Sequence, residues 1–273
     1  MRIRIRHETT YRYEQPARWI VQKLRLTPRH CSSQNIESWR IDIHRDCRLC
    51  ASEDAFGNIV HSFSVDGPFD SITALVEGDV ETFDMAGVLQ GVTENFPPQF
   101  YLRETQLTAL SPRLSAFARE STAGKTDTLS RLHELLAAIY TVMTFDTSTT
   151  HAATAAAEAF DHKSGVCQDF AHLFIACSRE LAIPARYVSG YFLRSDGQNN
   201  QPANHAWAEA YVEDLGWVGF DPAHGLSPDD AYVRVAGALD YLGAAPVRGA
   251  RAGGAGEALE VSVRVAAVQS QAQ

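Results

Sequence analysis

The chain is poor in cysteine and carries no excess of positive charge. Its 273 residues include five cysteines, 24 lysines and arginines and 33 acidic residues, and the net charge is −9. A sparse, odd set of cysteines is unlike a secreted disulfide scaffold, so we expect free thiols. The negative charge argues against binding to phosphate backbones, and we expect no nucleic-acid partner.

Long hydrophobic runs are also missing. No stretch reaches the roughly 18 uninterrupted apolar residues of a membrane span. Residues 1–15 (MRIRIRHETTYRYEQ) alternate charged and apolar positions and lack the apolar segment of a signal peptide. We therefore expect a cytoplasmic protein with no membrane partner. Hydrophobic residues still make up 45% of the chain, enough for one large core or two smaller ones.

The N-terminal part of the chain has a period-two pattern. Short alternating runs are separated by turn-forming segments such as residues 54–58 and 66–70. The pattern predicts an antiparallel β domain, resembling a sandwich, over residues 1–95. Pro97 and Pro98 then mark a linker.

The period changes to three or four residues after this linker. Apolar positions between Leu129 and Met143 predict one amphipathic helix, and a second is predicted over residues 166–181. Alternating runs at 186–193, 205–213 and 216–221 then predict strands. The sequence thus favours an α+β fold, with helices preceding an antiparallel sheet.

These patterns divide the chain into three parts. The β domain covers residues 1–95 and the helix-and-sheet core covers 96–235. Residues 236–273 form a C-terminal extension that is rich in glycine and alanine at first and alternates like a last strand at 259–265. The final residues, 269–273, are expected to be disordered.

Cys167 stands where a nucleophile is expected. In residues 164–171 (SGVCQDFA) it falls in the first turn of the second helix, with Ser164 as the predicted cap and Gly165 allowing a close backbone approach. Amide groups and the positive dipole end at a helix start favour thiolate over thiol. Cys177 lies on the apolar stripe of the same helix and is predicted to pack in the core.

His205 and Asp221 lie on the two arms of a predicted hairpin. If its turn lies near residues 213–215, Asp221 pairs back near His205, at the edge of the sheet. An Asp beside an imidazole selects its tautomer and stabilises the imidazolium, which in turn holds a thiolate as an ion pair. Cys167, His205 and Asp221 are therefore our candidate catalytic residues.

The segments around these residues strongly resemble the bacterial transglutaminase-like proteins. The matching segments are 165–173 (GVCQDFAHL), 182–191 (AIPARYVSGY), 205–207 (HAW) and 216–222 (GWVGFDP), with further likeness at 24–28, 54–58, 240–241 and 245–249. The resemblance implies a papain-like transglutaminase core preceded by an N-terminal β domain, with Cys167 as nucleophile, His205 as base and Asp221 as orienting acid. One departure is that Ala238 and Leu239 stand before Asp240-Tyr241, where the family often has Gly-Arg.

We therefore expect a transglutaminase-like cysteine peptidase or amidase that hydrolyses a peptide or small amide through a thioester, without a metal or organic cofactor. Three alternatives stay open. They are transfer to an amine acceptor, a noncatalytic interaction protein with this fold, and a zinc site at Cys167, His205 and Asp221.

Several other residues have two possible roles. Cys47 and Cys50 form a C-x-x-C, but no second ligand pair completes a zinc site, so we expect them to be structural. Asp169 could cap the helix or contact substrate, and Trp207 could shield the ion pair or pack in the core. His172 is expected to be structural. His224 falls in a loop after Asp221, where nothing in the sequence places it at the thiol.

Overall fold

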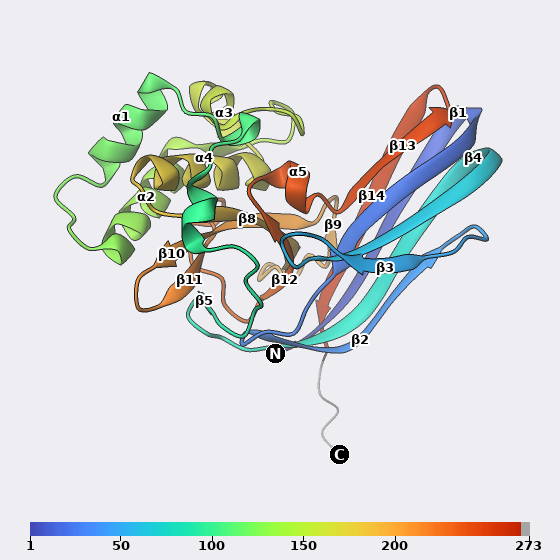
Figure 1. The fold of residues 1–273 in the computed structure, drawn as a ribbon, viewed down its shortest axis with the longest axis horizontal. Helices are drawn as coiled ribbons and strands as arrows, with labels where there is room; N and C mark the ends of the chain where they lie inside the picture. The colour runs from blue at the N-terminus through green and yellow to red at the C-terminus, as the bar shows by residue number, and fades with distance from the viewer. Residues whose placement is uncertain (269–273) are drawn as a thin grey trace, which may run out of the picture.

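The computed structural model describes residues 1–268, in which a helical region with a small sheet lies beside one large sheet (Figure 1). The predicted α+β class is confirmed. Across this described part of the chain, the helices fall short of the length and hydrophobicity of a membrane-spanning segment.

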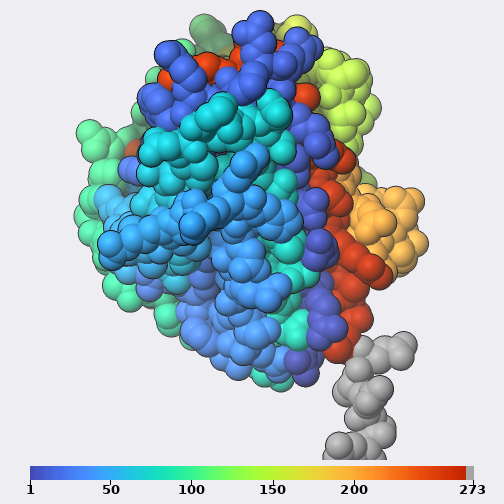
Figure 2. Space-filling view, turned by 90° about the vertical axis from the view of Figure 1, so that its right-hand side faces the viewer, coloured from blue at the N-terminus to red at the C-terminus, as the bar shows by residue number. Residues whose placement is uncertain are grey.

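The large sheet is entirely antiparallel. Its strands are β1 (Arg2–Thr27), β2 (Gln34–Ile43), β3 (Cys50–Glu53), β4 (Ile59–Thr82), β9 (Asn200–Gln201), β13 (Val247–Gly253) and β14 (Glu257–Ala267). The order is β2-β4-β1-β14-β9, with β3 also paired to β4 and β13 to β1. Figure 2 shows its outer face, on which β14 (red) runs beside β1 (blue).

Strand β1 owes its conformation to the alternation seen in the sequence, with Ile3 and Ile5 fully buried between exposed arginines. Its pairing with β4 shifts between Arg12 and Ala17, where β13 takes over from β14 as its other neighbour. The expected sandwich of two sheets is therefore wrong. One continuous sheet forms instead, because β1 is long enough to pair with both β13 and β14, and β4 is long enough to pair with both β2 and β3.

The C-terminal strands complete this sheet. The predicted strand at 259–265 is confirmed within β14, while the preceding β13 lies in a Gly-rich segment whose composition did not predict a strand. The described part of the predicted extension, 236–268, is therefore not separate from the large sheet, since β13 and β14 both pair with β1. The predicted disorder of 269–273 lies outside the described residues.

The smaller sheet holds the hairpin that was predicted to carry the site. Its strands are β5 (Val88–Leu89), β8 (Ala185–Phe192), β10 (His205–Val212), β11 (Gly216–Phe220) and β12 (Tyr232–Ala238), in the order β12-β8-β10-β11-β5. Strand β5 comes from inside the predicted domain 1–95, and β12 crosses the predicted boundary at 235. Both boundaries need correction because strand pairing, which joins β5 to β11, was not visible in the sequence.

The helices cover the smaller sheet. They are α1 (Pro112–Ser121), α2 (Thr128–Val142), α3 (Ala156–His162), α4 (Cys167–Glu180) and α5 (Tyr241–Ala244), with 3-10 helices η1 (Pro98–Leu102) and η2 (Gln106–Thr108) and a parallel pair β6 (Thr144–Phe145) and β7 (Ser164–Gly165). Both predicted helices are confirmed as α2 and α4.

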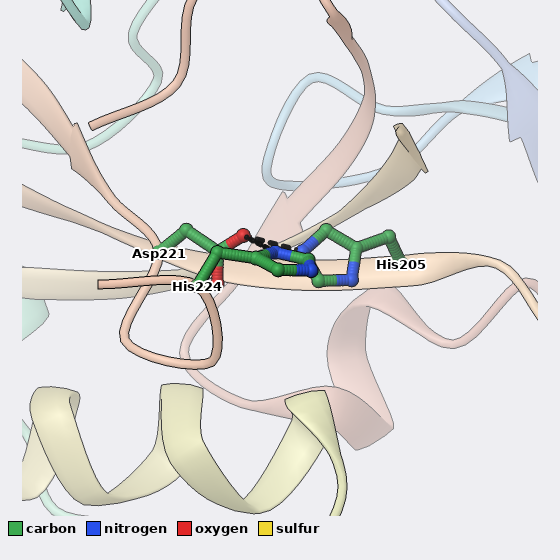
Figure 3. Close-up of side chains that lie close together, drawn as sticks. All are labelled: His205, Asp221 and His224. Atoms are coloured by element: carbon green, nitrogen blue, oxygen red, sulfur yellow. Dashed lines mark hydrogen bonds and ion pairs between the residues drawn. The ribbon is translucent and has the colours of Figure 1, made fainter. Parts of the chain in front are cut away.

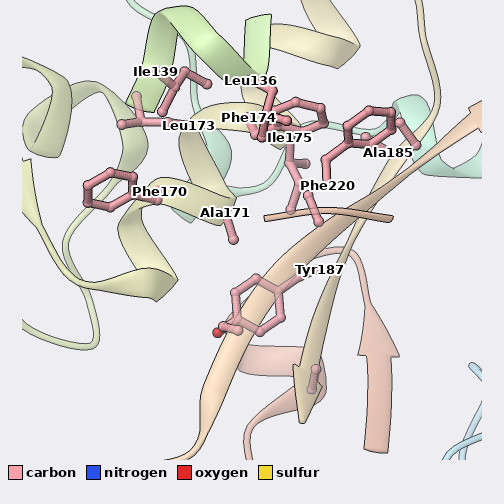
Figure 4. Close-up of a cluster of buried hydrophobic side chains, with 14 of the residues drawn as sticks. Leu136, Ile139, Phe170, Ala171, Leu173, Phe174, Ile175, Ala185, Tyr187 and Phe220 are labelled. Atoms are coloured by element: carbon pink, nitrogen blue, oxygen red, sulfur yellow. The ribbon is translucent and has the colours of Figure 1, made fainter. Parts of the chain in front are cut away.

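Helix α4 is the centre of the apolar core. Phe170 and Phe174 of α4 are buried, and Phe174 stacks on Phe220 of β11 at 5.0 Å between ring centroids (Figure 4). Ile3 of β1 and Val265 of β14 belong to the same buried cluster. The large sheet therefore packs against the helical region through a shared core, which holds α4 and its first residue, Cys167, in a defined place.

Candidate active site

Cys167 is the first residue of α4, as predicted, but its cap differs from the prediction. Ser164 donates its hydroxyl hydrogen bond to Thr149 rather than capping the helix. Asp169 instead accepts a hydrogen bond of 2.8 Å from the backbone amide of Val166, and this carboxylate is 1% exposed. Asp169 therefore acts on the helix start from within the helix.

Gly165 is required by this arrangement. A Cβ atom at Gly165 would lie 2.5 Å from Oδ2 of Asp169, closer than nonbonded atoms approach. The same Oδ2 accepts a hydrogen bond of 2.7 Å from Thr150. The loop before Cys167 and the first turn of α4 are thus locked together, which leaves the thiol in a half-buried position.

The hairpin of β10 and β11 brings His205 and Asp221 together. Ala208 pairs with Phe220, so the next residue, Asp221, comes level with the start of β10. Nε2 of His205 lies 2.6 Å from Oδ2 of Asp221, and Cys167 is close enough to His205 to raise the pKa of the imidazole. All three residues predicted for the site therefore meet at the start of α4 and the edge of the small sheet.

Burial and charge act in opposite directions at this pair. Burial lowers the pKa of His205, but the charge of Asp221, the hydrogen bond that Asp221 accepts from His205 and the nearby Cys167 outweigh it and raise the pKa to about 10. Burial likewise raises the pKa of Asp221, while His205 and His224 hold it well below its usual range. The buried carboxylate of Asp221 thus favours the protonated form of the His205 imidazole.

Two further side chains reach the same carboxylate, and sequence reasoning missed both. Nδ1 of His224 lies 2.7 Å from Oδ2 of Asp221 (Figure 3). The hydroxyl of Tyr232 lies 2.7 Å from the same oxygen, and the amide of Ala223 donates to Oδ1 at 3.0 Å. The turn Asp-Pro-Ala-His could have indicated His224, because it places residues 221 and 224 on one side of a turn. Tyr232 had no such signal, since it arrives on β12 from outside the hairpin.

Aromatic rings surround the imidazoles. Trp207 is 2% exposed and stacks on His205 with 6.1 Å between ring centroids. The ring centroids of Phe192 and His224 are 4.6 Å apart. Trp207 also belongs to a buried cluster with Tyr232. Trp207 therefore both shields the His205–Asp221 pair and packs in the core, so its two predicted roles are compatible.

Hydrogen bonds, rather than metal coordination, account for the separations within this cluster. The ligand atoms of His205, Asp221 and His224 lie within 4.8 Å of one another, which is close enough to consider a metal. Both nitrogens, however, lie 2.6 to 2.7 Å from the Asp221 oxygen. Ligands of a tetrahedral zinc ion with bonds of about 2.0 Å lie roughly 3.3 Å apart. The residues fit zinc poorly as they stand, and we derive no step through a metal.

Cys177 and His172 both lie in the buried core around α4. Cys177 is fully buried in α4, and burial raises the pKa of its thiol. His172 is also fully buried, which lowers its pKa to about 3, and its Nε2 accepts a hydrogen bond of 3.1 Å from the amide of Tyr241. Cys47 and Cys50 are free thiols, and Cys50 begins β3 of the large sheet.

Comparison with known proteins supports this architecture. Residues 115–222 match the transglutaminase-like superfamily core, and residues 3–81 match the bacterial transglutaminase-like N-terminal region. An uncharacterized protein of Mycobacterium leprae is 28% identical over 285 residues, which cover 97% of this chain and 98% of the relative.

Two further proteins are similar. The crystal structure of a candidate cysteine protease from Cytophaga hutchinsonii shares the fold, with a TM-score of 0.80 and 22% identity over 100% of this chain and 92% of that chain. A shorter match, 32% identical over 101 residues, is to a protein-glutamine gamma-glutamyltransferase of Pseudomonas aeruginosa, and it covers 32% of this chain and 15% of that protein. From its core and its N-terminal region together, the chain belongs to the transglutaminase-like superfamily, in the group with the bacterial N-terminal region.

Proposed function

We propose that this protein is a cysteine-dependent acyl-transfer enzyme, a transglutaminase-like cysteine peptidase or amidase that hydrolyses a peptide or small amide through a thioester at Cys167. The observation that carries the proposal is His205, which hydrogen-bonds to the buried Asp221 and lies close enough to Cys167, at the start of α4, for Cys167 to raise its pKa. A thiol, an imidazole and a carboxylate in this order are the parts that nucleophilic acyl transfer needs.

In the first half-reaction, the Cys167 thiolate attacks the carbonyl carbon of the substrate and forms a tetrahedral intermediate. The C–N bond then breaks, the imidazolium of His205 gives its proton to the departing amine, and a thioester remains on Cys167. Asp221 stays ionised throughout and holds the ring of His205 in place.

In the second half-reaction, His205 takes a proton from water, and the resulting oxygen nucleophile attacks the thioester carbonyl. The C–S bond breaks, the carboxylic acid product leaves, and the thiolate and imidazolium are restored. The site's own residues supply the nucleophile, the acid and the base, so this sequence of steps needs no metal or organic cofactor.

The backbone amide of Cys167 is our candidate donor to the carbonyl oxygen as it gains charge. The first amides of a helix have no acceptor within the helix and point toward its N-terminus. Such a donor stabilises the tetrahedral intermediate more than the planar substrate, which is what accelerates the reaction.

An amine could replace water as the acceptor. The name of the Pseudomonas aeruginosa relative, a protein-glutamine gamma-glutamyltransferase, favours this second candidate function. Hydrolysis remains our first choice, because transfer to an amine needs a second binding surface for the acceptor, and the sequence indicates none.

A substrate screen tests both candidates. Peptide amides and glutamine-containing peptides are incubated with the protein, with and without a primary amine, and products are identified by mass spectrometry. We expect acid products that do not require the amine. Cys167→Ala should keep its circular dichroism spectrum and lose turnover by at least about 10³-fold, whereas Cys47→Ala and Cys50→Ala should keep activity. Turnover that persists in Cys167→Ala would exclude covalent catalysis at this residue.

A further inference from the structure

A single oxygen atom, Oδ2 of Asp221, is shared by two imidazoles and a phenol. His205 approaches it at 2.6 Å, and His224 and Tyr232 approach it at 2.7 Å each. Figure 3 shows both imidazole rings directed at the same side of the carboxylate. The proposed reaction uses the contact with His205 alone, and so the contact with His224 needs its own explanation.

We propose that His224 is a positioning residue that weakens the hold of Asp221 on His205, so that the His205 imidazolium can release its proton to the leaving group. This inference rests on the proposed function of the Cys167 site. It adds a residue to that site which neither the sequence motif nor the family comparison indicates.

The protonation of His224 follows from its partner. An ionised carboxylate accepts hydrogen bonds and donates none, so Nδ1 of His224 carries the hydrogen that points to Asp221. This holds whether the ring is neutral or charged. Every donor on a carboxylate stabilises its charge and reduces the attraction that remains for the other partners. His224 and Tyr232 therefore both compete with His205 for one oxygen.

The competition matters because the proposed reaction asks His205 to act as an acid. Asp221 holds the His205 proton so strongly that the pKa is raised to about 10, although burial alone would lower it. A general acid works best when its pKa lies near the operating pH. Other donors to Asp221 weaken its attraction for the His205 proton and therefore lower the pKa of His205 toward the operating pH.

His224 can be changed without opening the site. Its side chain is 36% exposed, compared with 9% for His205. Within residues 1–268, the ionisable groups that face His224 are Asp221 and His205, with the Tyr232 hydroxyl on the same Asp221 oxygen and Tyr140 of α2 packed against the neighbouring Gly225. The ring centroids of His205 and His224 are 4.9 Å apart, so a charge on one imidazole affects the other electrostatically.

The test measures the rate of Cys167 alkylation by iodoacetate from pH 4 to 11, with the labelled site identified by peptide mapping. The alkaline transition reports the loss of the His205 proton and needs no substrate. We expect His224→Ala to move this transition upward by ~0.5 to 1 pH unit, because one donor to Asp221 is gone. His224→Asn should restore the wild-type transition, since its side-chain amide places an N–H near the position of Nδ1.

Two more variants complete the design. Tyr232→Phe removes a second donor without leaving a cavity and should move the transition in the same direction as His224→Ala. His44→Asn changes an exposed histidine at the end of β2 on the large sheet and serves as the matched control, which should follow the wild type.

The outcomes separate this inference from the proposed function. If wild-type Cys167 reacts rapidly at neutral pH but the His224→Ala transition coincides with that of the wild type, or moves downward, His224 has no such role and the inference is overturned alone. If wild-type Cys167 reacts no faster than an ordinary thiol, the ion pair is absent, and both the proposed function and this inference fail.

Discussion

The smaller sheet contains two buried carboxylates whose partners differ in kind. Glu209 of β10 is 3% exposed, and its oxygens accept from Arg186 at 2.6 Å and Arg234 at 2.7 Å. Asp221 is fully buried and accepts from two imidazoles and a phenol. Both residues are acids at the centre of a polar cluster, and the partners decide what each cluster does.

Guanidinium groups keep their charge at every physiological pH, whereas imidazoles gain and lose it. Burial raises the pKa of Glu209, but Arg234 and Arg186 outweigh it and lower the pKa to about 2. Arg186 also pairs with Glu94 at 2.7 Å and lies 3.9 Å from the ring centroid of Trp217. The Glu209 cluster therefore keeps its charges and has a structural role, whereas the Asp221 cluster contains imidazoles that can gain and lose a proton. The comparison teaches that burial of an acid does not by itself indicate catalysis.

Neutralising Asp221 tests the difference between the two clusters most directly. Asp221→Asn keeps the size of the side chain and removes the charge that holds the His205 imidazolium. A similar change in a serine triad costs roughly 10⁴ in turnover. We expect a smaller loss here, about 10- to 10³-fold, because the helix start also favours the thiolate. Steady-state kinetics measures the first effect, and slower Cys167 alkylation at neutral pH is the second.

An Asp221→Asn variant that matched the wild type in both assays would make Asp221 a structural residue like Glu209. The third member of the triad would then have to be sought among the other groups near His205.

The complementary experiment to Asp221→Asn neutralises Glu209. Glu209→Gln leaves the buried Arg186 and the half-buried Arg234 without their shared anion, and breaking a buried ion pair costs about 3 to 5 kcal/mol. We expect a loss of that size in the free energy of unfolding, measured with urea, while turnover of the folded fraction stays within about threefold of the wild type. A variant that kept its stability and lost turnover would reverse the assignment of the two clusters.

The smallest expected effect is the pH dependence of stability. The pKa of His205 is raised from 6.5 to about 10 in the folded protein. A raised histidine pKa stabilises the folded state fully below pH 6.5, and this contribution is lost as the pH rises toward 10. We expect the free energy of unfolding to fall by about 1 to 3 kcal/mol more across this range in the wild type than in His205→Gln. Parallel curves for the two proteins would show that Asp221 does not hold His205 charged.

Much of the fold followed from local patterns. The apolar spacing from Leu129 to Met143 predicted α2 within two residues of each end, and the alternation after His205 predicted β10 and β11. The domain boundaries did not follow, because β13 and β14 pair with β1 across more than 200 residues of chain. Alternation indicates that a segment is a strand but carries no information about its neighbour in the sheet.

The same division applies to the site. Local sequence determined that Cys167 begins a helix and that Asp221 returns beside His205 in a hairpin, because both depend on contacts within a few residues. Only the tertiary structure decided that the hairpin edge meets the start of α4, and that Tyr232 arrives on β12 to share the Asp221 oxygen. Those contacts arise from packing through a common core, whose geometry is set by all of its side chains together.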